Sequence, residues 1–191
     1  MNPLPILIPS AFSDAFCDDV IKLASHLPEF DAMTGDGAVI GDGAVNNSHR
    51  RSKARWILPD TDSQFIFSSL DRVFRDINRD CFGFDIDFIP GIQFTEYDAS
   101  YEGKFDWHID NVIRREAVYN RKLSMTIQLS PSTSYEGGNL LFRGKAELPV
   151  EETRPRGTVI VFPSFLEHCV TPVTQGTRLS LVAWIEGPNF R

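Results

Sequence analysis

The stretch LSMTIQLS at residues 123–130 alternates apolar and polar side chains without a break. Successive side chains of a β-strand point to opposite faces of a sheet, so this period of two predicts a strand with one apolar and one polar face. The apolar set is Leu123, Met125, Ile127 and Leu129, and the polar set is Ser124, Thr126, Gln128 and Ser130. We expect the apolar face to pack into a core and the polar face to line a cavity.

Similar short segments occur on both sides of this stretch. Strands are expected at 91–97, 105–110, 139–143, 157–162, 168–173 and 178–185. Turn signals separate several of them, at Glu136-Gly137-Gly138, Arg156-Gly157 and Gln175-Gly176. Many short strands with a polar face predict two facing sheets around a lined cavity, which is jelly-roll architecture. We expect this core to occupy residues 86–188.

Residues 1–85 have a helical rather than a strand-like pattern. Ser13 can cap a helix that ends near Pro28, and a second helix is expected to begin at 60–62 and to end before Gly83. Residues 34–55, between the two helices, are expected to form a turn-rich, lid-like loop. The chain is therefore predicted to be a single domain, 1–191, of the mainly β α+β class, with the N-terminal helices packed on one sheet.

The loop at 34–55 has two further features. GDGAV occurs twice, at 35–39 and 41–45, but the full ligand pattern of a calcium loop is missing. A basic run extends from His49 to Arg55. This run could recognise an acidic substrate or simply be a solvated part of the loop.

The composition limits the classes of partner and compartment. Acidic residues outnumber basic ones by 26 to 19, and the net charge of −7 argues against general binding to nucleic acid or anionic membranes. No stretch approaches the roughly 20 apolar residues that span a bilayer, and the N-terminus lacks the features of a signal peptide. The 3 widely spaced cysteines are typical of reduced thiols, so we expect a cytoplasmic protein. The oligomeric state is left open.

In the expected strand 105–110, Phe105, Trp107 and Ile109 alternate with Asp106, His108 and Asp110. His108 and Asp110 should therefore lie on one face, and the apolar set should pack inward on the other. One further histidine would complete the triad of two histidines and one carboxylate that non-heme Fe(II) oxygenases use. His168, at the start of a late strand, is the best candidate, whereas His26 and His49 are expected at the surface. A His-x-Asp motif alone is a weak signal, and its interpretation depends on the residues around it.

Arg178 follows His168 by ten residues and shares its strand parity with Ser180, so it should point into the same cavity. A buried, unpaired guanidinium is very costly. A small dicarboxylate would satisfy it through a bidentate pair, with Ser180 adding a hydrogen bond. The alternative is an internal salt bridge to Glu96 or Glu186.

Taken together, three segments resemble the 2-oxoglutarate/Fe(II) dioxygenases, and most closely their prolyl 4-hydroxylase-like branch with the PKHD-type hydroxylases. The segments are 94–110 (FTEYDASYEGKFDWHID), 121–142 (RKLSMTIQLSPSTSYEGGNLLF) and 157–188 (GTVIVFPSFLEHCVTPVTQGTRLSLVAWIEGP). They cover roughly the C-terminal half of the chain. The resemblance implies a double-stranded β-helix, a form of jelly roll, and hydroxylation of an unactivated C–H bond with release of succinate and CO₂.

The resemblance also implies roles for single residues. His108, Asp110 and His168 would bind Fe(II), and Arg178 with Ser180 would hold the distal carboxylate of 2-oxoglutarate. Tyr97 matches a tyrosine that touches the cosubstrate, with a core aromatic as the alternative. Gln128 stands where some relatives have a tyrosine that contacts the same carboxylate. O₂ is the third reactant, and ascorbate is a further candidate.

The substrate implied by the resemblance is a prolyl residue of a peptide or protein, with a free amino acid or small metabolite as the close competitor. A cupin-like metal-binding module or zinc hydrolase is a rival of another class, because zinc also accepts two histidines and a carboxylate. Arg178 with Ser180 argues against it, since a zinc hydrolase has no need of them there. A third possibility is a catalytically silent binding domain that keeps only the fold. The triad together with Arg178 argues against it, because such a domain has no physical need of all four residues.

Overall fold

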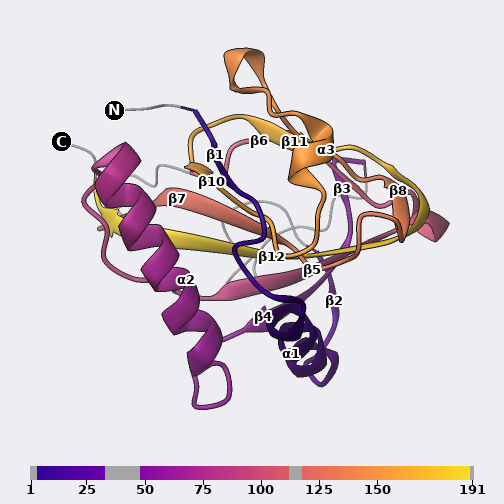
Figure 1. Ribbon diagram of the computed structural model, residues 1–191, viewed down its shortest axis with the longest axis horizontal. Helices are drawn as coiled ribbons and strands as arrows, with labels where there is room; N and C mark the ends of the chain where they lie inside the picture. The colour runs from indigo at the N-terminus through magenta and orange to yellow at the C-terminus, as the bar shows by residue number, and fades with distance from the viewer. Residues whose placement is uncertain (1–3, 33–47, 112–117, 190–191) are drawn as a thin grey trace.

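The computed structural model describes residues 4–32, 48–111 and 118–189, and two antiparallel sheets form its centre (Figure 1). The larger sheet has the order β1-β10-β7-β12-β5-β4-β2, with β8 paired to β12, and the smaller has the order β3-β6-β11-β9. The strands of the larger sheet are β1 (Ile6–Ile8), β2 (Phe30–Asp31), β4 (Lys53–Ile57), β5 (Ile92–Asp98), β7 (Tyr119–Gln128), β8 (Tyr135–Gly137), β10 (Val159–Pro163) and β12 (Val173–Pro188). Those of the smaller are β3 (Arg50–Arg51), β6 (Lys104–His108), β9 (Leu140–Phe142) and β11 (His168–Val170). The predicted mainly β jelly roll is confirmed.

Two long helices cover the larger sheet. They are α1 (Asp14–Ser25) and α2 (Gln64–Ile77), and the short helical segments are η1 (Asn78–Phe82), η2 (Ala99–Tyr101), η3 (Gly144–Ala146) and α3 (Val150–Thr153). The Ser13 hydroxyl caps α1 as predicted, accepting the Phe16 N–H at 3.2 Å. Helix α2 begins slightly later than expected because Asp60 and Ser63 first form a local turn, in which the Ser63 N–H donates to Asp60 Oδ1 at 2.8 Å.

As expected, the alternation in β7 directs its apolar side chains into the core and its polar side chains toward the smaller sheet. Leu123, Met125 and Ile127 are fully buried in the core that the larger sheet shares with α1 and α2. Ser124 and Thr126 point to the other face, toward the smaller sheet, and are also buried. Burial of the apolar set contributes roughly 1.5–3 kcal/mol per side chain, which fixes the register of β7 and with it the direction of its polar residues.

Three expectations about single elements were wrong. Of the residues expected in the loop, 50–51 form β3 and 53–55 belong to β4. Gln175 and Gly176 lie within β12, at an irregularity of its pairing with β8, and Gly176 has a φ of +68°. Trp107 and Ile109, expected to pack inward, are exposed, and the Arg143 guanidinium carbon lies 4.5 Å from the centre of the Trp107 ring.

Some expectations concern residues that the structure does not describe. Both GDGAV segments and the part of the lid-like loop up to residue 47 lie outside them. Within the described residues, no helix is both long enough and apolar enough to cross a bilayer. Cys17, Cys81 and Cys169 are free thiols.

Candidate active site

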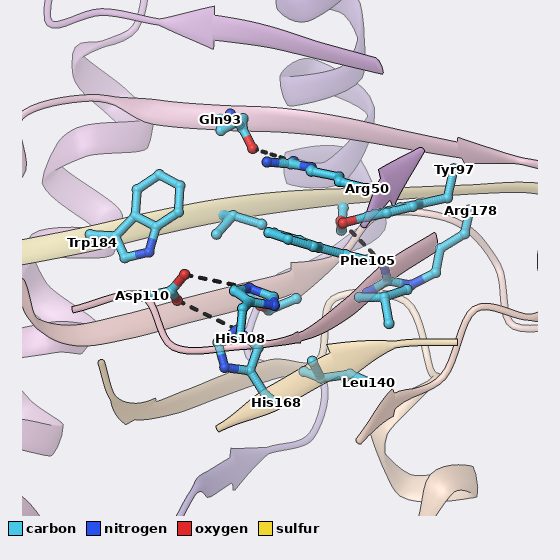
Figure 2. Close-up of a pocket in the computed structure, with 14 residues that line it drawn as sticks. Arg50, Gln93, Tyr97, Phe105, His108, Asp110, Leu140, His168, Arg178 and Trp184 are labelled. Carbon is cyan, nitrogen blue, oxygen red and sulfur yellow. Dashed lines mark hydrogen bonds and ion pairs between the residues drawn. The ribbon is translucent and has the colours of Figure 1, made fainter. Parts of the chain in front are cut away.

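His108, Asp110 and His168 converge between the two sheets (Figure 2). His108 ends β6 and His168 begins β11, and the two are direct partners in the antiparallel pairing of these strands. Asp110 follows β6, where its N–H donates to the Ser164 carbonyl at 2.8 Å. One ligand atom from each of the three side chains lies within 4.8 Å of the others, a separation that one metal ion can bridge.

Both imidazoles are oriented for metal binding. The Nδ1 atoms lie 2.7 Å from the Asp106 carbonyl oxygen for His108 and 2.9 Å from the Leu166 carbonyl oxygen for His168. An Nδ1–H that donates to such a carbonyl leaves Nε2 with its lone pair, which is the tautomer a metal requires. The two Nε2 atoms then face the Asp110 carboxylate, at 3.7 Å from Oδ1 and 3.6 Å from Oδ2.

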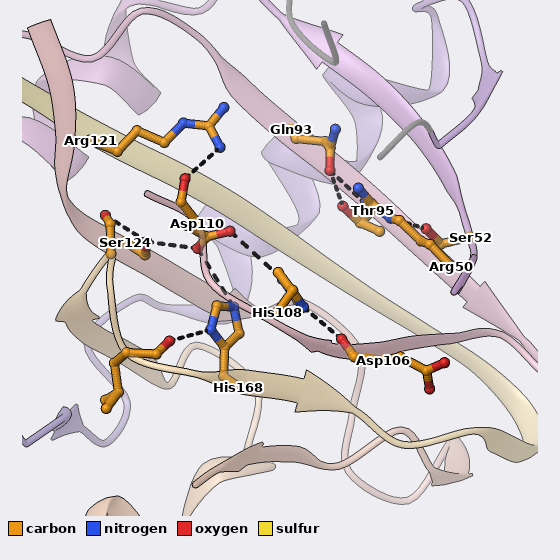
Figure 3. A network of polar contacts seen from close by, with 12 residues as sticks. Arg50, Ser52, Gln93, Thr95, Asp106, His108, Asp110, Arg121, Ser124 and His168 are labelled. Carbon is orange, nitrogen blue, oxygen red and sulfur yellow. Dashed lines mark hydrogen bonds and ion pairs between the residues drawn. The ribbon is translucent and has the colours of Figure 1, made fainter. Parts of the chain in front are cut away.

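A hydrogen-bond network behind Asp110 fixes its carboxylate (Figure 3). The Ser124 hydroxyl donates to Asp110 Oδ2 at 2.7 Å and lies 3.0 Å from the Ser164 hydroxyl. Arg121 Nη1 approaches the Asp110 carbonyl oxygen at 3.5 Å. Partners of this kind orient a metal ligand and set its affinity.

The protonation states suit a metal as well. Burial, together with the neighbouring His168, lowers the pKa of His108 to about 4. Burial alone would raise the pKa of Asp110, but His168, His108 and Arg121 outweigh it and lower that pKa to about 2. Near pH 7 His108 is therefore neutral and Asp110 ionised, and both are the forms that bind a metal.

Arg178 is the largest fully buried side chain, with 1% of its surface exposed. Its Nη1 donates to Ser180 Oγ over a long 3.5 Å, and among the described residues Nε and Nη2 have no hydrogen-bond partner. Neither Glu96 nor Glu186 forms a salt bridge with it in that part of the chain. A buried guanidinium with free donors is costly unless a ligand carboxylate accepts from them.

Arg178 and the triad line one pocket. Ser180 and Tyr97 also line it, and the Tyr97 ring lies 5.4 Å from the Arg178 guanidinium carbon. Gln128 is buried but does not line this pocket, and among the described residues its Oε1 has no partner. Thr126, two residues earlier on the same face of β7, lines the pocket instead.

Several pocket residues were absent from the sequence-based site. Arg50, Gln93, Phe105 and Leu140 line the pocket beside the predicted residues, and so does Trp184. Arg50 belonged to the basic run, but no fixed spacing connects that run with the His-x-Asp motif. The alternation assigned Phe105 to the face opposite His108, yet their rings stack with centroids 3.5 Å apart. The pairing of β6 with β11 shifts register between these two residues, and this bulge brings them together.

His49 is also placed differently from the prediction. It was expected at the surface, but it is only half-exposed and packs edge-on to Phe105, with ring centroids 5.5 Å apart. Its ring centroid is 6.4 Å from that of His108. The basic run thus begins beside the candidate metal ligands.

The residues present fit an iron ion with 2-oxoglutarate. Two imidazoles and one carboxylate are the donor set of non-heme Fe(II) oxygenases, and His108, Asp110 and His168 would hold the iron here. Arg178 Nε and Nη2, which have no partner among the described residues, would donate to a carboxylate in the same pocket. The candidate metal ligands and Arg178 thus line one pocket.

Comparisons with known proteins agree with this geometry. The model of the 2OG-Fe(II) oxygenase superfamily matches residues 92–186. A PKHD-type hydroxylase from Synechococcus sp. (strain CC9902) is 40% identical over 179 residues, which are 88% of this chain and 73% of that protein. The chain belongs to the 2OG-Fe(II) oxygenase superfamily. The family predicted from the three segments is thereby confirmed.

Other similarities of this oxygenase cover less of the relative or show the fold alone. A PKHD-type hydroxylase from Synechococcus sp. (strain CC9605) is 44% identical over 82 residues, which are 43% of this chain and only 36% of that protein. A Trichoplax adhaerens prolyl hydroxylase, solved with a hypoxia inducible factor peptide fragment, superposes with a TM-score of 0.73 at 17% identity. That superposition covers 96% of this chain and 83% of the other.

Proposed function

We propose that this oxygenase hydroxylates an unactivated C–H bond with Fe(II), 2-oxoglutarate and O₂, and that its substrate is a prolyl residue of a peptide or protein. His108, Asp110 and His168 would hold the iron. Arg178 and Ser180 would bind the distal carboxylate of 2-oxoglutarate, with Tyr97 against the cosubstrate. Succinate and CO₂ would be the co-products.

One observation carries the proposal, namely that Arg178, in the pocket of the triad, has no carboxylate partner among the described residues. A structural arginine would be expected to have a carboxylate or carbonyl partner. This one keeps two donors without a partner in the described part of the chain while only 1% of its surface is exposed. A zinc hydrolase has no use for such a group, so the arrangement favours a carboxylate-bearing cosubstrate over that rival.

The protein would supply geometry and exclude water. The carbonyls of Asp106 and Leu166 hold the two imidazoles in place, and Ser124 holds the Asp110 carboxylate. Arg178 would fix one end of the cosubstrate and so decide how its other end meets the metal. Iron loaded with 2-oxoglutarate and O₂ supplies the oxidising power that breaks the C–H bond, which no side chain can provide.

The prolyl substrate is supported by the relatives. The proteins similar in sequence are PKHD-type hydroxylases, and the structural neighbour described above is a prolyl hydroxylase solved with a peptide. A free amino acid or a small metabolite would use the same pocket and the same cosubstrate. Ascorbate is a candidate for a further cofactor with either class of substrate.

The test begins with cosubstrate binding. Protein loaded anaerobically with Fe(II) should bind 2-oxoglutarate in a calorimetric titration, and O₂ should then yield succinate. Arg178→Gln should weaken 2-oxoglutarate by about 100-fold, because two charge-assisted hydrogen bonds are lost. Prolyl peptides incubated with the loaded enzyme should gain the mass of one oxygen atom.

Arg143→Gln is the matched control, since Arg143 is exposed and pairs with Glu167 at 2.8 Å away from the pocket. Its affinity for 2-oxoglutarate should equal that of the wild type. Absence of cosubstrate binding and of succinate in the wild type would overturn the proposed function. Undiminished binding by Arg178→Gln would overturn the role of Arg178 alone.

A further inference from the structure

Arg154, which follows α3, makes four hydrogen bonds to one short segment of the chain. Its Nη1 donates to the Gly137 carbonyl and to Asn139 Oδ1, both at 2.8 Å. Its Nη2 donates to the Ser132 carbonyl at 3.1 Å and to the Tyr135 carbonyl at 2.7 Å. The guanidinium carbon also lies 4.2 Å from the centre of the Tyr135 ring. A guanidinium has a rigid fork of donors, so these bonds fix the acceptors relative to one another.

The segment that Arg154 holds is residues 132–139, hereafter the β8 segment. It contains β8, which pairs with the first part of β12. The pairing ends where Gly137 and Gly138 follow one another with φ of +71° and +59°. Backbone carbonyls at such a turn need partners outside the sheet. Arg154 supplies one for Gly137 and thereby fixes the turn.

The β8 segment packs against the stem of Arg178. A Cβ at Gly138 would lie 2.9 Å from Arg178 Cδ and 3.5 Å from Tyr135 Cε2, so no space is left between the segment and the arginine. Tyr135 is itself buried. Leu140, directly after the segment, lines the pocket together with Arg178 (Figure 2). The β8 segment is therefore the wall behind the Arg178 end of the pocket.

Arg178 depends on this wall for its orientation. Among the described residues, its guanidinium has one hydrogen bond, the long contact with Ser180 at 3.5 Å, while Nε and Nη2 have none. A long side chain with so few hydrogen bonds is held in one rotamer by the groups packed around its stem. Displacement of the β8 segment would therefore free Arg178 to change its rotamer.

We propose that Arg154 is a positioning residue for the cosubstrate site, which holds the β8 segment against Arg178 and so directs that guanidinium toward the distal carboxylate of 2-oxoglutarate. The inference rests on the proposed function, because it assumes that Arg178 binds this carboxylate. Arg154 does not line the pocket, so it acts through the segment alone. Its contribution is preorganisation, which lowers the entropy lost when a ligand orders its binding residues.

The experiment compares three ligands of the full chain by calorimetry. They are Mn(II) on the metal-free protein, and 2-oxoglutarate and 2-oxopentanoate on the Mn(II)-loaded protein. 2-Oxopentanoate keeps the carbon chain and the metal-binding end of 2-oxoglutarate, but a methyl group replaces the distal carboxylate. Arg154→Gln should weaken 2-oxoglutarate about tenfold, because ordering one long side chain on binding costs up to about that factor. Its affinities for Mn(II) and 2-oxopentanoate should equal those of the wild type.

Arg156→Gln is the matched control. Arg156 lies two residues farther along the chain and also donates to a backbone carbonyl, that of Leu129 at 2.7 Å, but its other partner is Asp18 of α1. This variant should lose stability in urea unfolding and bind all three ligands as the wild type does. Arg154→Lys keeps the charge with a single nitrogen for the four acceptors. It should weaken 2-oxoglutarate about threefold, and this measurement decides the matter if Arg154→Gln does not fold.

Three outcomes would overturn the proposal. In the first, the folded Arg154 variants bind 2-oxoglutarate as tightly as the wild type. In the second, they lose Mn(II) or 2-oxopentanoate by the same factor, which would mean a general distortion of the pocket. In the third, Arg156→Gln loses 2-oxoglutarate equally, so that any loss of stability has this effect. Failure of the proposed function looks different, since wild type would then not bind 2-oxoglutarate at all.

Discussion

Ser124 has a direct role in setting the position of Asp110. Its hydroxyl donates to Oδ2 at 2.7 Å inside a fully buried network. Ser124→Ala removes this donor and frees the carboxylate to rotate, so metal affinity should fall about 10- to 100-fold, as is typical for partners of metal ligands. A calorimetric titration of the metal-free protein with Mn(II) measures the change.

Ser68→Ala serves as the control, because Ser68 lies exposed on α2. It should bind Mn(II) as the wild type does. Equal affinities for all three proteins would mean that other contacts alone position Asp110.

Gly138 makes room for Arg178. A Cβ at this position would lie 2.9 Å from Arg178 Cδ and 2.9 Å from Val173 Cγ2, and the backbone has a φ of +59°. Gly138→Ala should therefore displace the guanidinium and weaken 2-oxoglutarate at least about tenfold, besides the cost of about 1 kcal/mol for a side chain at positive φ. Cosubstrate titration and urea unfolding separate the two effects.

Gly144→Ala isolates the backbone part of that change. Gly144 has a φ of +74°, but nothing lies within 4 Å of a Cβ built there. Gly144→Ala should lose about the 1 kcal/mol expected for a side chain at positive φ, and its affinity for 2-oxoglutarate should equal that of the wild type. If both glycine variants bind the cosubstrate equally well, the space beside Arg178 has no role in binding.

At the scale of the elements, Asp98 connects three of them. It ends β5, caps η2 through a hydrogen bond from the Ser100 N–H at 2.9 Å, and accepts the hydroxyl of Thr177 from β12. Hydrogen bonds from Ser100 and Thr177 lower the pKa of Asp98. A lowered folded-state pKa contributes stability above the unfolded value of about 3.9, and this contribution is lost as the pH falls through the folded value.

Asp98→Asn should consequently be less stable than wild type at pH 7, and the difference should shrink as the pH falls from about 5 toward 3. Urea midpoints measured at several pH values test this. Asp14→Asn is a suitable comparison because Asp14 is largely exposed in the first turn of α1. A gap between wild type and Asp98→Asn that stays constant over this pH range would exclude the protonation of Asp98 as its cause.

The elements also show what a pattern of residues can and cannot predict. The period of two in β7 and β12 identified their buried faces, because both strands lie inside the larger sheet with a core on one side. The two residues of β3 are too few to show any period. The β6 bulge moved Phe105 to the face of His108, and alternation alone cannot reveal such a shift.

The same limit applies to the residues of the site, since only some of them can be predicted from a pattern in the sequence. The intervals along the chain between the triad residues and Arg178 are visible in the sequence, because these residues lie at fixed positions on strands of the jelly roll. Arg50 and Gln93 come from earlier strands, and the pairing of β3 with β6 and of β5 with β12 brings them to the pocket. Long-range pairing of this kind is a property of the fold and leaves no local pattern.

At the scale of the whole molecule, the N-terminal part belongs to both sheets. β2 and β4 extend the larger sheet, β3 joins the smaller one, and β1 pairs with β10 at the opposite edge of the larger sheet. Residues 86–188 thus do not contain the complete jelly roll, contrary to the boundary expected from the sequence. Helices α1 and α2 share one buried cluster with β7, β10 and β12. We expect a chain so connected to unfold as one unit.

Thermal unfolding of the whole chain tests this together with the proposed ligands. The metal-free protein should unfold in a single transition, and Mn(II) should raise its Tm because the metal-binding residues come together only in the folded state. Adding 2-oxoglutarate at about 100 times its Kd should stabilise the metal-loaded protein by a further 2.7 kcal/mol or so. Arg178→Gln should keep the first shift and lose the second, and excess chelator should reverse both. Two separate transitions would contradict the single domain. If 2-oxoglutarate still raised the Tm of Arg178→Gln, the cosubstrate would be held elsewhere, because a ligand stabilises a protein only through the site that binds it.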